Sequence, residues 1–308
     1  MIGQDDPAAT RVAFIGLGHM GGPMCRHVIE GGFSVVAYDR DPEALVRAAG
    51  HGARAATDLV ACVTGADILV TSLPGPAQVQ DVLCGEAGAI AALAPGTLVV
   101  EMSTISPEGG RRAQGEAAEA GVQLIDAPVA GQTIGAEAGT LAIYAGGEPT
   151  AFHRALPVLK TMGDPDRIFH LGPAGSGYAV KLLLNLTWFV QSVAIGEALT
   201  IGVRAGVPLD RLHAALVNSP ANSVFLERDV LPVLDQGDYD EGFAMKLVTK
   251  DLALAVDLAR DVGVAAELAA LVEGIHRRAR ERYGDEAGEM SAIRLYEDAT
   301  GTELRWRS

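Results

Sequence analysis

A glycine-rich segment near the start of the chain constrains the fold most strongly. Gly16, Gly18 and Gly21 are spaced Gly-x-Gly-x-x-Gly and directly follow the apolar run at residues 12–15. After a strand and at the start of a helix, the first glycine permits a tight turn. The second lets the backbone approach a pyrophosphate, and the third allows close helix–strand packing. The free N–H groups and positive dipole end of the helix favour an anion. The segment therefore predicts a dinucleotide-binding strand–helix–strand unit.

An acidic residue follows the glycines at a fitting distance. Asp39 ends the second predicted strand, 21 residues after Gly18, and an acid about 20 residues on typically holds the adenosine ribose hydroxyls. Its charge favours NAD, whereas the guanidinium of Arg40 could pair with the extra phosphate and leaves NADP open. A solvated or helix-capping aspartate is the alternative interpretation. The residues expected to hold the cofactor here are Gly16, Leu17, Gly18, His19, Met20, Gly21, Asp39 and Arg40.

Short β-branched runs alternate with Ala-rich segments through the first half of the chain. Strands are predicted at residues 12–15, 34–39, 68–72, 98–101, 123–126, 141–145 and 167–170. Helices are predicted at residues 20–30, 42–49, 77–93 and 107–120. The alternation predicts the α/β class, with a doubly wound parallel sheet covered by helices on both faces.

The pattern changes after the breaker cluster Gly-Pro-Ala-Gly at residues 172–175. Strand signals cease, and helices are predicted at residues 175–205, 209–217, 223–234, 243–262, 265–283 and 291–299. We therefore expect a Rossmann domain over residues 1–172 and an all-helical substrate and oligomerisation domain over residues 173–308. The apolar stretch 182–203 is interrupted by Asn185, Gln191, Ser192 and Glu197 and predicts a buried soluble helix rather than a membrane span.

Composition excludes several classes of protein. The 308 residues are 49% hydrophobic, which predicts a folded chain, and their net charge of −15 argues against nucleic-acid and membrane partners. Three dispersed cysteines without a Cys-x-x-Cys pair predict no disulfide and a cytoplasmic location, and the seven histidines lack paired metal-ligand spacing, so no metal is expected. The first ten residues carry acids and no apolar run, which predicts a disordered lead-in rather than a signal peptide.

Five segments, in chain order, resemble a single family. They are GLGHMGGPM at 16–24, EMSTISP at 101–107, DAPVAGQTIGAEAGTL at 126–141, GSGYAVKLLLN at 175–185 and FAMKLVTKDLALAVDLA at 243–259. Together they resemble the β-hydroxyacid dehydrogenases, a group that includes 3-hydroxyisobutyrate dehydrogenase and tartronate semialdehyde reductase. The resemblance covers nearly the whole chain. It implies a reversible hydride transfer between a nicotinamide cofactor and a small anionic 3-hydroxy acid or its semialdehyde, in a cleft between the two domains.

Lys181 is the catalytic residue that the resemblance implies. It lies on an otherwise apolar helix, where desolvation lowers the pKa of a lysine and readies the amine to exchange a proton near neutral pH. Asn185 is four residues on, so both side chains share one helix face. By the resemblance, the pair holds the substrate hydroxyl and exchanges its proton. A lysine that snorkels from a buried helix, with Asn185 in an ordinary polar contact, is the alternative.

The resemblance also implies residues near the nicotinamide. Ser103, in the turn after a strand, would bind the substrate carboxylate or contact the nicotinamide side of the site, and Ser106 is the better helix cap. Leu73 and Pro74 would border the nicotinamide ribose. Lys250 would reach both cofactor and substrate from the helical domain. A surface charge paired with a nearby aspartate, Asp251 or Asp257, is the other interpretation of Lys250.

One loop departs from the family pattern. Relatives usually carry Asp-Ala-Pro-Val-Ser-Gly-Gly, whereas this chain has Ala130 and Gln132 around Gly131. Gly131 would offer backbone N–H groups to the substrate carboxylate. Gln132 adds a side-chain donor and acceptor at a position expected to touch substrate, which favours a substrate with an unusual polar end.

Rival activities remain on the same fold. Decarboxylating 6-phosphogluconate dehydrogenases carry a His and a Gly where this chain has Leu184 and Leu186, so that activity is not expected. An imine reductase-like activity and a non-catalytic dinucleotide-binding relative are the alternatives, although Lys181 speaks against both. The long apolar helix exceeds what one small domain buries, which predicts a homodimer or homotetramer.

Overall fold

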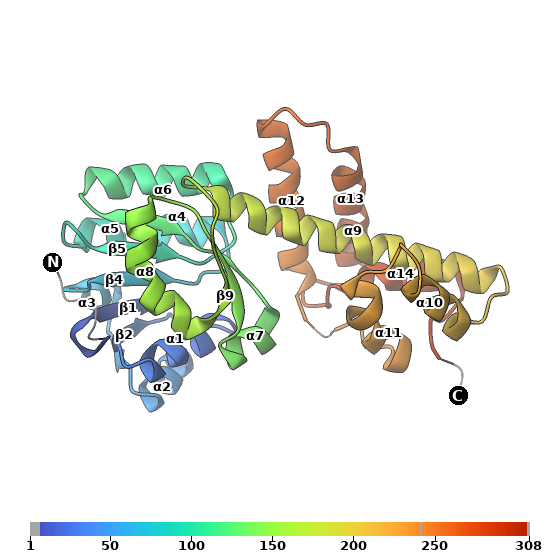
Figure 1. Cartoon of the computed structure of the whole chain (residues 1–308), viewed down its shortest axis with the longest axis horizontal. Helices are drawn as coiled ribbons and strands as arrows, with labels where there is room; N and C mark the ends of the chain where they lie inside the picture. Colours follow the sequence, from blue (N-terminus) through green and yellow to red (C-terminus); the bar gives the residue numbers. More distant parts are fainter. Residues whose placement is uncertain (1–6, 241, 307–308) are drawn as a thin grey trace. The chain divides into compact units, whose positions relative to one another are not determined.

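The computed structural model describes residues 7–240 and 242–306. The chain divides into two compact units, Met1–Lys181 and Leu182–Ser308, which can be followed by colour in Figure 1. The first unit contains the sheets, and the second is helical throughout its described residues. The predicted order of an α/β unit followed by a helical unit is thereby confirmed.

A parallel sheet of six strands forms the centre of the N-terminal unit, in the order β3-β2-β1-β4-β5-β6. Its strands are β1 (Arg11–Ile15), β2 (Ser34–Tyr38), β3 (Arg54–Ala55), β4 (Ile68–Thr71), β5 (Leu98–Glu101) and β6 (Gln123–Asp126). Every residue of β4 and β5 is buried, because helices cover both faces of such a sheet. This strand order is that of the doubly wound dinucleotide-binding fold.

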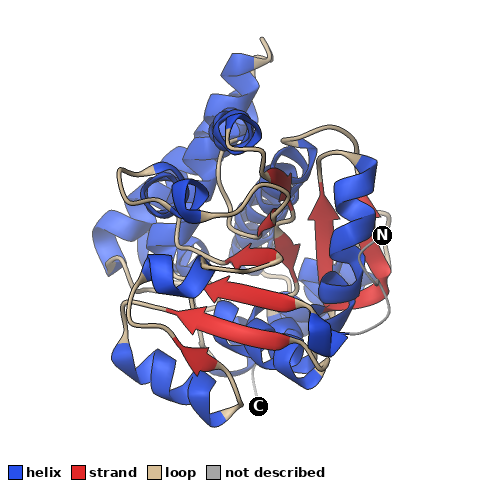
Figure 2. Cartoon of the chain, turned by 90° about the vertical axis from the view of Figure 1, so that its left-hand side faces the viewer, coloured by secondary structure: helices blue, strands red, loops and turns tan. Residues whose placement is uncertain are grey.

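Helices pack on both faces of this sheet (Figures 1 and 2). One face is covered by α1 (Gly21–Glu30), α2 (Pro42–Gly50) and α8 (Pro149–Met162), the other by α3 (Leu59–Val63), α4 (Pro76–Cys84), α5 (Ala89–Ala92) and α6 (Pro107–Glu119). Strand side chains alternate between the faces. Val12 and Phe14 therefore join the first core, and Ala13 and Ile15 join the second.

A second, three-stranded sheet follows in the same unit, in the order β7-β8-β9. It contains β7 (Val129–Ala130), antiparallel to β8 (Leu141–Ala145), and β9 (Gly163–His170), parallel to β8; α7 (Gln132–Ala138) links the first two strands. The sequence analysis missed β3, β7, α3, α7 and α8. Two-residue strands are too short for a period-2 pattern, and α8 contains the internal helix breaker Pro157.

Three sequence-based predictions are wrong in detail. The helix predicted at residues 77–93 is two helices, because the chain turns at Gly85. The turn is tight, since a β-carbon at Gly88 would lie 2.6 Å from the Leu83 carbonyl oxygen. The helix predicted at residues 223–234 is a π-helical turn, η2 (Phe225–Asp229), followed by α11 (Leu231–Gln236) with Pro232 in its first turn. Within the predicted disordered lead-in, η1 (Pro7–Ala9) is an ordered 3-10 turn; residues 1–6 lie outside the described residues.

The helical unit contains most of α9 (Ser176–Arg204), which starts in the N-terminal unit. Its other long helices are α10 (Leu209–Val217), α12 (Met245–Asp261), α13 (Glu267–Tyr283) and α14 (Ser291–Thr300). One apolar cluster surrounds Phe225 and Leu234. Another joins α12 and α13 through Val248, Val272 and Ile275.

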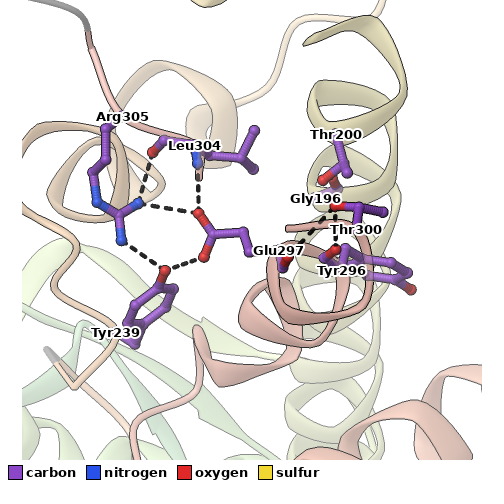
Figure 3. A network of polar contacts seen from close by, with 8 residues as sticks. All are labelled: Gly196, Thr200, Tyr239, Tyr296, Glu297, Thr300, Leu304 and Arg305. Atoms are coloured by element: carbon purple, nitrogen blue, oxygen red, sulfur yellow. Dashed lines mark hydrogen bonds and ion pairs between the residues drawn. The ribbon is translucent and has the colours of Figure 1, made fainter. Parts of the chain in front are cut away.

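A polar network attaches the C-terminal segment to α14 (Figure 3). Glu297, which is buried, accepts hydrogen bonds from the Tyr239 hydroxyl and from the Leu304 N–H, the latter at 2.6 Å. Arg305 donates to Glu297 at 3.2 Å and to the Tyr239 hydroxyl at 2.7 Å. Burial, followed by the hydrogen bond to Glu297, raises the pKa of Tyr239 to about 12. This pair of a half-buried tyrosine and a buried glutamate holds the end of the described chain in place.

The surface of α9 is less buried than its sequence predicts. Only 28% of its most apolar stretch is buried, and Leu183 and Ile201 are 51% and 67% exposed. The prediction of a buried helix is therefore wrong for the single chain. Among the described residues, α9 is also the one helix with the length and apolar composition to cross a membrane, a test that core helices of soluble proteins also pass.

Candidate active site and cofactor-binding turn

The glycine turn joins β1 to α1, and the structure places different constraints on its three glycines. Gly16 has a φ of +93°, and a β-carbon there would lie 2.1 Å from the Ser72 carbonyl oxygen. A β-carbon at Gly21 would lie 1.9 Å from the Gly16 carbonyl oxygen. A β-carbon at Gly18 would meet no heavy atom of the described chain within 4 Å. The first and third glycines are therefore required by the fold, while the second adjoins open space.

The start of α1 is suited to an anion. Its N-cap residue is Met20, and no side chain among the described residues caps it through a hydrogen bond. The Gly22 N–H already donates to the Gly18 carbonyl oxygen at 2.9 Å, and Pro23 has no N–H. The helix therefore offers an anion mainly the positive end of its dipole. Gly18 and His19 are exposed beside it, and Leu17 is buried. These residues fit the pyrophosphate of a dinucleotide, which would fill the space next to Gly18.

Asp39 is attached directly to the glycine turn. Its Oδ2 accepts the Leu17 N–H at 2.6 Å, and its Oδ1 accepts the Asp41 N–H at 2.8 Å. Asp41, rather than Asp39, caps α2 by accepting the Glu43 N–H. A carboxylate has room for further donors beyond these two, so Asp39 retains acceptor capacity for ribose hydroxyls.

Arg40 lies on the exposed side of the same strand end. Its guanidinium pairs with Asp81 of α4 at 3.0 Å, and both side chains are exposed. An exposed ion pair of this kind contributes little and is easily exchanged.

Ser103 and Leu73 lie together after neighbouring strands. Ser103 is buried, and its Oγ accepts the Leu73 N–H at 2.8 Å, while Pro74 follows Leu73 on the exposed side. The cap of α6 is Ser106, which accepts the Gly109 N–H at 3.1 Å, so Ser103 has no capping role in that helix. Two residues predicted near the nicotinamide are thus in direct contact.

A buried carboxylate that the sequence analysis did not single out lies beneath Ser103. Glu101, at the end of β5, is fully buried; its Oε1 accepts the Ser103 N–H at 2.9 Å and the Thr71 hydroxyl at 3.3 Å. Its Oε2 accepts the hydroxyl of Tyr178, in the first turn of α9, at 2.6 Å. Burial raises the pKa of Glu101, against the effect of these hydrogen bonds.

A second buried acid, Asp126, ends the neighbouring strand β6. It accepts the Gly175 N–H at 2.8 Å and the Tyr178 N–H at 3.1 Å, and burial raises its pKa. Burial, followed by the two nearby carboxylates, raises the pKa of Tyr178 well above its ordinary value. The signal that could have revealed this network is an acid at the end of each of two adjacent buried strands, where ligands of such sheets bind.

Gly131 and Gln132 are exposed at the start of α7. Gly131 has a φ of +134°, and Gln132 has a φ of +55°. For a residue with a side chain this left-handed conformation costs roughly 1–2 kcal/mol. The other end of α7 is held to α1, since Glu137 accepts hydrogen bonds from Arg26 at 2.9 Å and, through its carbonyl oxygen, contacts His27 at 3.0 Å.

Lys181 and Asn185 are one helical turn apart on α9, and both are half-buried. Their spacing places both side chains on one face of the helix. The division between the two units falls directly after Lys181.

Asn185 and Lys250 share a buried partner, Asp251. The Asn185 amide donates to Asp251 Oδ2 at 2.6 Å, and Lys250 Nζ lies 3.1 Å from Asp251 Oδ1. The Asp251 side chain is fully buried, which distinguishes this cluster from a surface ion pair. Asp251 was considered in the sequence analysis only as a surface partner of Lys250. The other aspartate weighed there, Asp257, pairs instead with Arg260 at 2.7 Å.

The three thiols do not offer a nucleophile. Cys25, Cys62 and Cys84 are free, and burial raises the pKa of each to about 12, whereas reactive cysteines have a lowered pKa. Among residues 7–240 and 242–306, no group of three or more His, Cys, Asp and Glu side chains is arranged to hold a metal ion.

Two family models match the chain. Residues 11–172 match the NAD binding domain of 6-phosphogluconate dehydrogenase, and residues 175–296 match the NAD-binding domain of NADP-dependent 3-hydroxyisobutyrate dehydrogenase. The gap between the two matches coincides with the breaker cluster at residues 172–175.

Curated relatives align over most of the chain. A 2-(hydroxymethyl)glutarate dehydrogenase of Eubacterium barkeri is 34% identical, covering 96% of this chain and 98% of its own. A 3-hydroxyisobutyrate dehydrogenase of Pseudomonas aeruginosa is 35% identical, covering 86% of this chain and 91% of its own. An NAD-dependent L-serine dehydrogenase of the same organism is also 35% identical, covering 87% of this chain and 91% of its own.

Solved structures share the fold. A 3-hydroxyisobutyrate dehydrogenase of Mycobacterium tuberculosis, studied with L-serine, superposes with a TM-score of 0.86 at 32% identity, covering 93% of this chain and 98% of its own. An imine reductase of Myxococcus stipitatus reaches a TM-score of 0.63 at 18% identity, covering 93% and 98%, and this similarity concerns the fold alone.

Proposed function

We propose that this chain interconverts a small 3-hydroxy acid and its semialdehyde. The chain belongs to the 3-hydroxyisobutyrate dehydrogenase (β-hydroxyacid dehydrogenase) family and is an NAD(P)-dependent oxidoreductase acting on CH–OH groups. Bound nicotinamide supplies the acceptor or donor of the hydride. The protein binds and orients the substrate and handles the proton.

Lys181 is the proposed general acid–base. As the carbinol C–H bond breaks and hydride leaves, the neutral amine of Lys181 takes the hydroxyl proton, so that a carbonyl and an ammonium result; reduction runs through the same steps in reverse. Asn185 holds the hydroxyl oxygen. The observation that carries this proposal is the position of Asn185 one helical turn after Lys181, with its amide oriented by buried Asp251.

The proposed substrate is a small carboxylate. Ser103, the N–H groups around Gly131 and the ammonium of Lys250 would bind its negative charge. The acids in the names of the relatives, 3-hydroxyisobutyrate, L-serine and 2-(hydroxymethyl)glutarate, each carry a hydroxymethyl group on the carbon next to a carboxylate. Because Gln132 places an amide at the exposed start of α7, we propose that the preferred acid has a further polar end.

We propose NAD as the preferred cofactor. The carboxylate of Asp39 is held at the glycine turn by the Leu17 N–H, where it would accept the ribose hydroxyls and repel a 2′-phosphate. The exposed pair of Arg40 with Asp81 is too weak to decide this preference, which therefore rests on Asp39. Relatives and structural neighbours use both cofactors, as the NAD-dependent L-serine dehydrogenase and a 25%-identical structure containing NADP⁺ illustrate.

A second copy of the chain is the proposed cover for the apolar surface of α9. Exposed Leu183, Leu184 and Ile201 lie on this helix, and burial of such a surface in a homodimer or homotetramer would be favourable. A monomeric mass by light scattering at micromolar concentration would overturn this assembly. We propose a cytoplasmic location on the cysteine usage of the sequence.

A substrate panel tests the function. Purified protein is assayed with NAD and NADP against 3-hydroxyisobutyrate, L-serine and 2-(hydroxymethyl)glutarate, and with NADH and NADPH against short semialdehydes and a cyclic imine. We expect turnover of at least one hydroxymethyl acid, fastest with NAD. Reduction of the imine alone would indicate an imine reductase, and dinucleotide binding without any turnover would indicate a non-catalytic relative.

A further inference from the structure

Three segments that are far apart in the sequence meet at the Glu101 carboxylate. They are the end of β4 with Thr71, the turn after β5 with Ser103, and the first turn of α9 with Tyr178, at donor–acceptor distances of 3.3, 2.9 and 2.6 Å. All of these residues belong to the N-terminal unit. The two oxygens of Glu101 thus receive three hydrogen bonds, enough to offset much of the cost of burying a carboxylate.

Tyr178 has little freedom to move away from Glu101. The residue is 1% exposed, and its ring packs against Gly110 of α6, where a β-carbon would lie 2.2 Å from the ring. Its backbone N–H is bound by Asp126. The first turn of α9 is therefore held both through its backbone and through the Tyr178 hydroxyl.

Both ends of this arrangement lead to residues of the proposed reaction. Tyr178 precedes Lys181 by three residues, so a shift of the tyrosine along or around the helix moves the lysine with it. On the other side, Glu101 binds the Ser103 N–H, and the Ser103 hydroxyl binds the N–H of Leu73. One buried carboxylate thus connects the lysine helix to the turns expected beside the nicotinamide.

We propose that Glu101 and Tyr178 are positioning residues that hold the Lys181 helix and the Ser103 turn in a single geometry for hydride and proton transfer. This inference rests on the proposed function. The two residues touch neither hydride nor proton, and act through Ser103 and Lys181.

The test compares two tyrosine hydroxyls that donate to a buried glutamate. Tyr178→Phe removes only the hydrogen bond to Glu101. Tyr239→Phe, in the helical unit, removes the corresponding bond to Glu297 together with the bond that Arg305 donates to the same hydroxyl (Figure 3). Single-turnover hydride transfer is followed by NADH absorbance with the most active acid of the panel, and NADH affinity and melting temperature are measured separately. We expect Tyr178→Phe to slow hydride transfer about ten-fold while NADH affinity is unchanged. Tyr239→Phe should lower only the melting temperature.

Glu101→Gln provides the second arm. Its amide can no longer accept from all three donors, so it should slow hydride transfer and also weaken NADH binding through Ser103 and Leu73. The double variant of Glu101→Gln with Tyr178→Phe should be no slower than Glu101→Gln alone, because Glu101→Gln already removes the carboxylate to which the Tyr178 hydroxyl donates.

Four outcomes would overturn the proposal. The first is that folded Tyr178→Phe transfers hydride within about two-fold of the rate of the unsubstituted enzyme, and the second is that Tyr239→Phe slows the transfer equally. The third is that the losses of rate in the two single variants multiply in the double variant, and the fourth, which applies if Tyr178→Phe does not fold, is that Glu101→Gln leaves both the rate and the NADH affinity unchanged. Absence of hydride transfer in the unsubstituted enzyme would instead overturn the proposed function, and this inference with it. The two failures are therefore distinguishable by the unsubstituted enzyme alone.

Discussion

The two units place their candidate functional groups by different means. In the N-terminal unit, backbone groups position the cofactor-binding turn and its neighbours, through the Gly16 turn, the Leu17 N–H on Asp39 and the Leu73 N–H on Ser103. In the helical unit, Asn185 and Lys250 are arranged by the Asp251 side chain. Backbone sites leave a glycine spacing that the sequence reveals, whereas side-chain clusters depend on partners that are distant in the chain.

Loss of the proposed acid–base should have the largest effect. Lys181→Ala removes the group that exchanges the hydroxyl proton, and we expect kcat to fall about 10³-fold. NADH affinity, which depends on the N-terminal backbone turn, should stay unchanged when measured by fluorescence titration. Lys160→Ala, at an exposed lysine of α8, serves as the control. Retention of most of the turnover by Lys181→Ala would show that the lysine is not catalytic.

The side-chain cluster of the helical unit can be broken at Asp251. Asp251→Asn removes the charge that faces Lys250 and disturbs the hydrogen bond to Asn185, so we expect kcat/KM to fall about 30-fold, as for a lost charge-assisted hydrogen bond. Asp257→Asn, on the same helix and paired with exposed Arg260, should change little. Equal effects of the two substitutions in steady-state kinetics would remove Asp251 from the site.

The helical unit should also respond to acid through one buried histidine. His276 on α13 is fully buried, hydrogen-bonds the Val272 carbonyl oxygen through Nδ1, and lacks a described hydrogen-bond partner at Nε2. Burial lowers its pKa from 6.5 to about 4. The unfolded chain therefore binds the proton more readily. The stability contributed by neutral His276 is complete above pH 6.5 and is lost as the pH falls towards 4.

Urea unfolding at pH 8 and pH 5 measures this contribution. Because of His276, the free energy of unfolding should be about 2 kcal/mol lower at pH 5 than at pH 8. His276→Leu should abolish that part of the pH dependence. His51→Leu, at an exposed position of the N-terminal unit, is the matched control. An unchanged pH dependence in His276→Leu would contradict this assignment.

The smallest expected effect is at Gln132, the described non-glycine residue with a positive φ. Gln132→Gly relieves the left-handed strain, and after the entropy of glycine is counted the protein should gain about 0.5–1 kcal/mol in the free energy of unfolding. Gln80→Gly, inside α4, should instead lose about 1 kcal/mol. On the panel, Gln132→Gly should lose selectivity for acids with a further polar end. A loss of stability would argue against the strain.

The sequence predicts most of this fold because its periodic patterns are long. Strands β1, β5, β6 and β8 and helices α9, α10 and α14 end within a residue of their predicted limits. The elements that were missed are short or interrupted, such as β3 with two residues and α8 with an internal proline. In these elements, tertiary packing rather than local pattern determines the backbone.

In the candidate site too, local patterns were predictable from the sequence and long-range contacts were not. Gly-x-Gly-x-x-Gly and the following aspartate can be identified from spacing alone, because the turn requires particular residue types at fixed intervals. Glu101 and Tyr178 are 77 residues apart, and Asn185 and Asp251 are 66 apart. No local rule pairs such residues, so their hydrogen bonds become visible only in the folded chain.

The glycine turn also distinguishes selection for folding from selection for turnover. At Gly16 and Gly21 an added methyl group meets backbone within 2.1 Å, whereas at Gly18 the chain itself offers no obstacle. A library sorted for folded protein would thus reject alanine at the first and third positions and accept it at the second. A library sorted for turnover would reject all three. The difference between the two libraries isolates the constraint that the ligand imposes from the constraint that folding imposes.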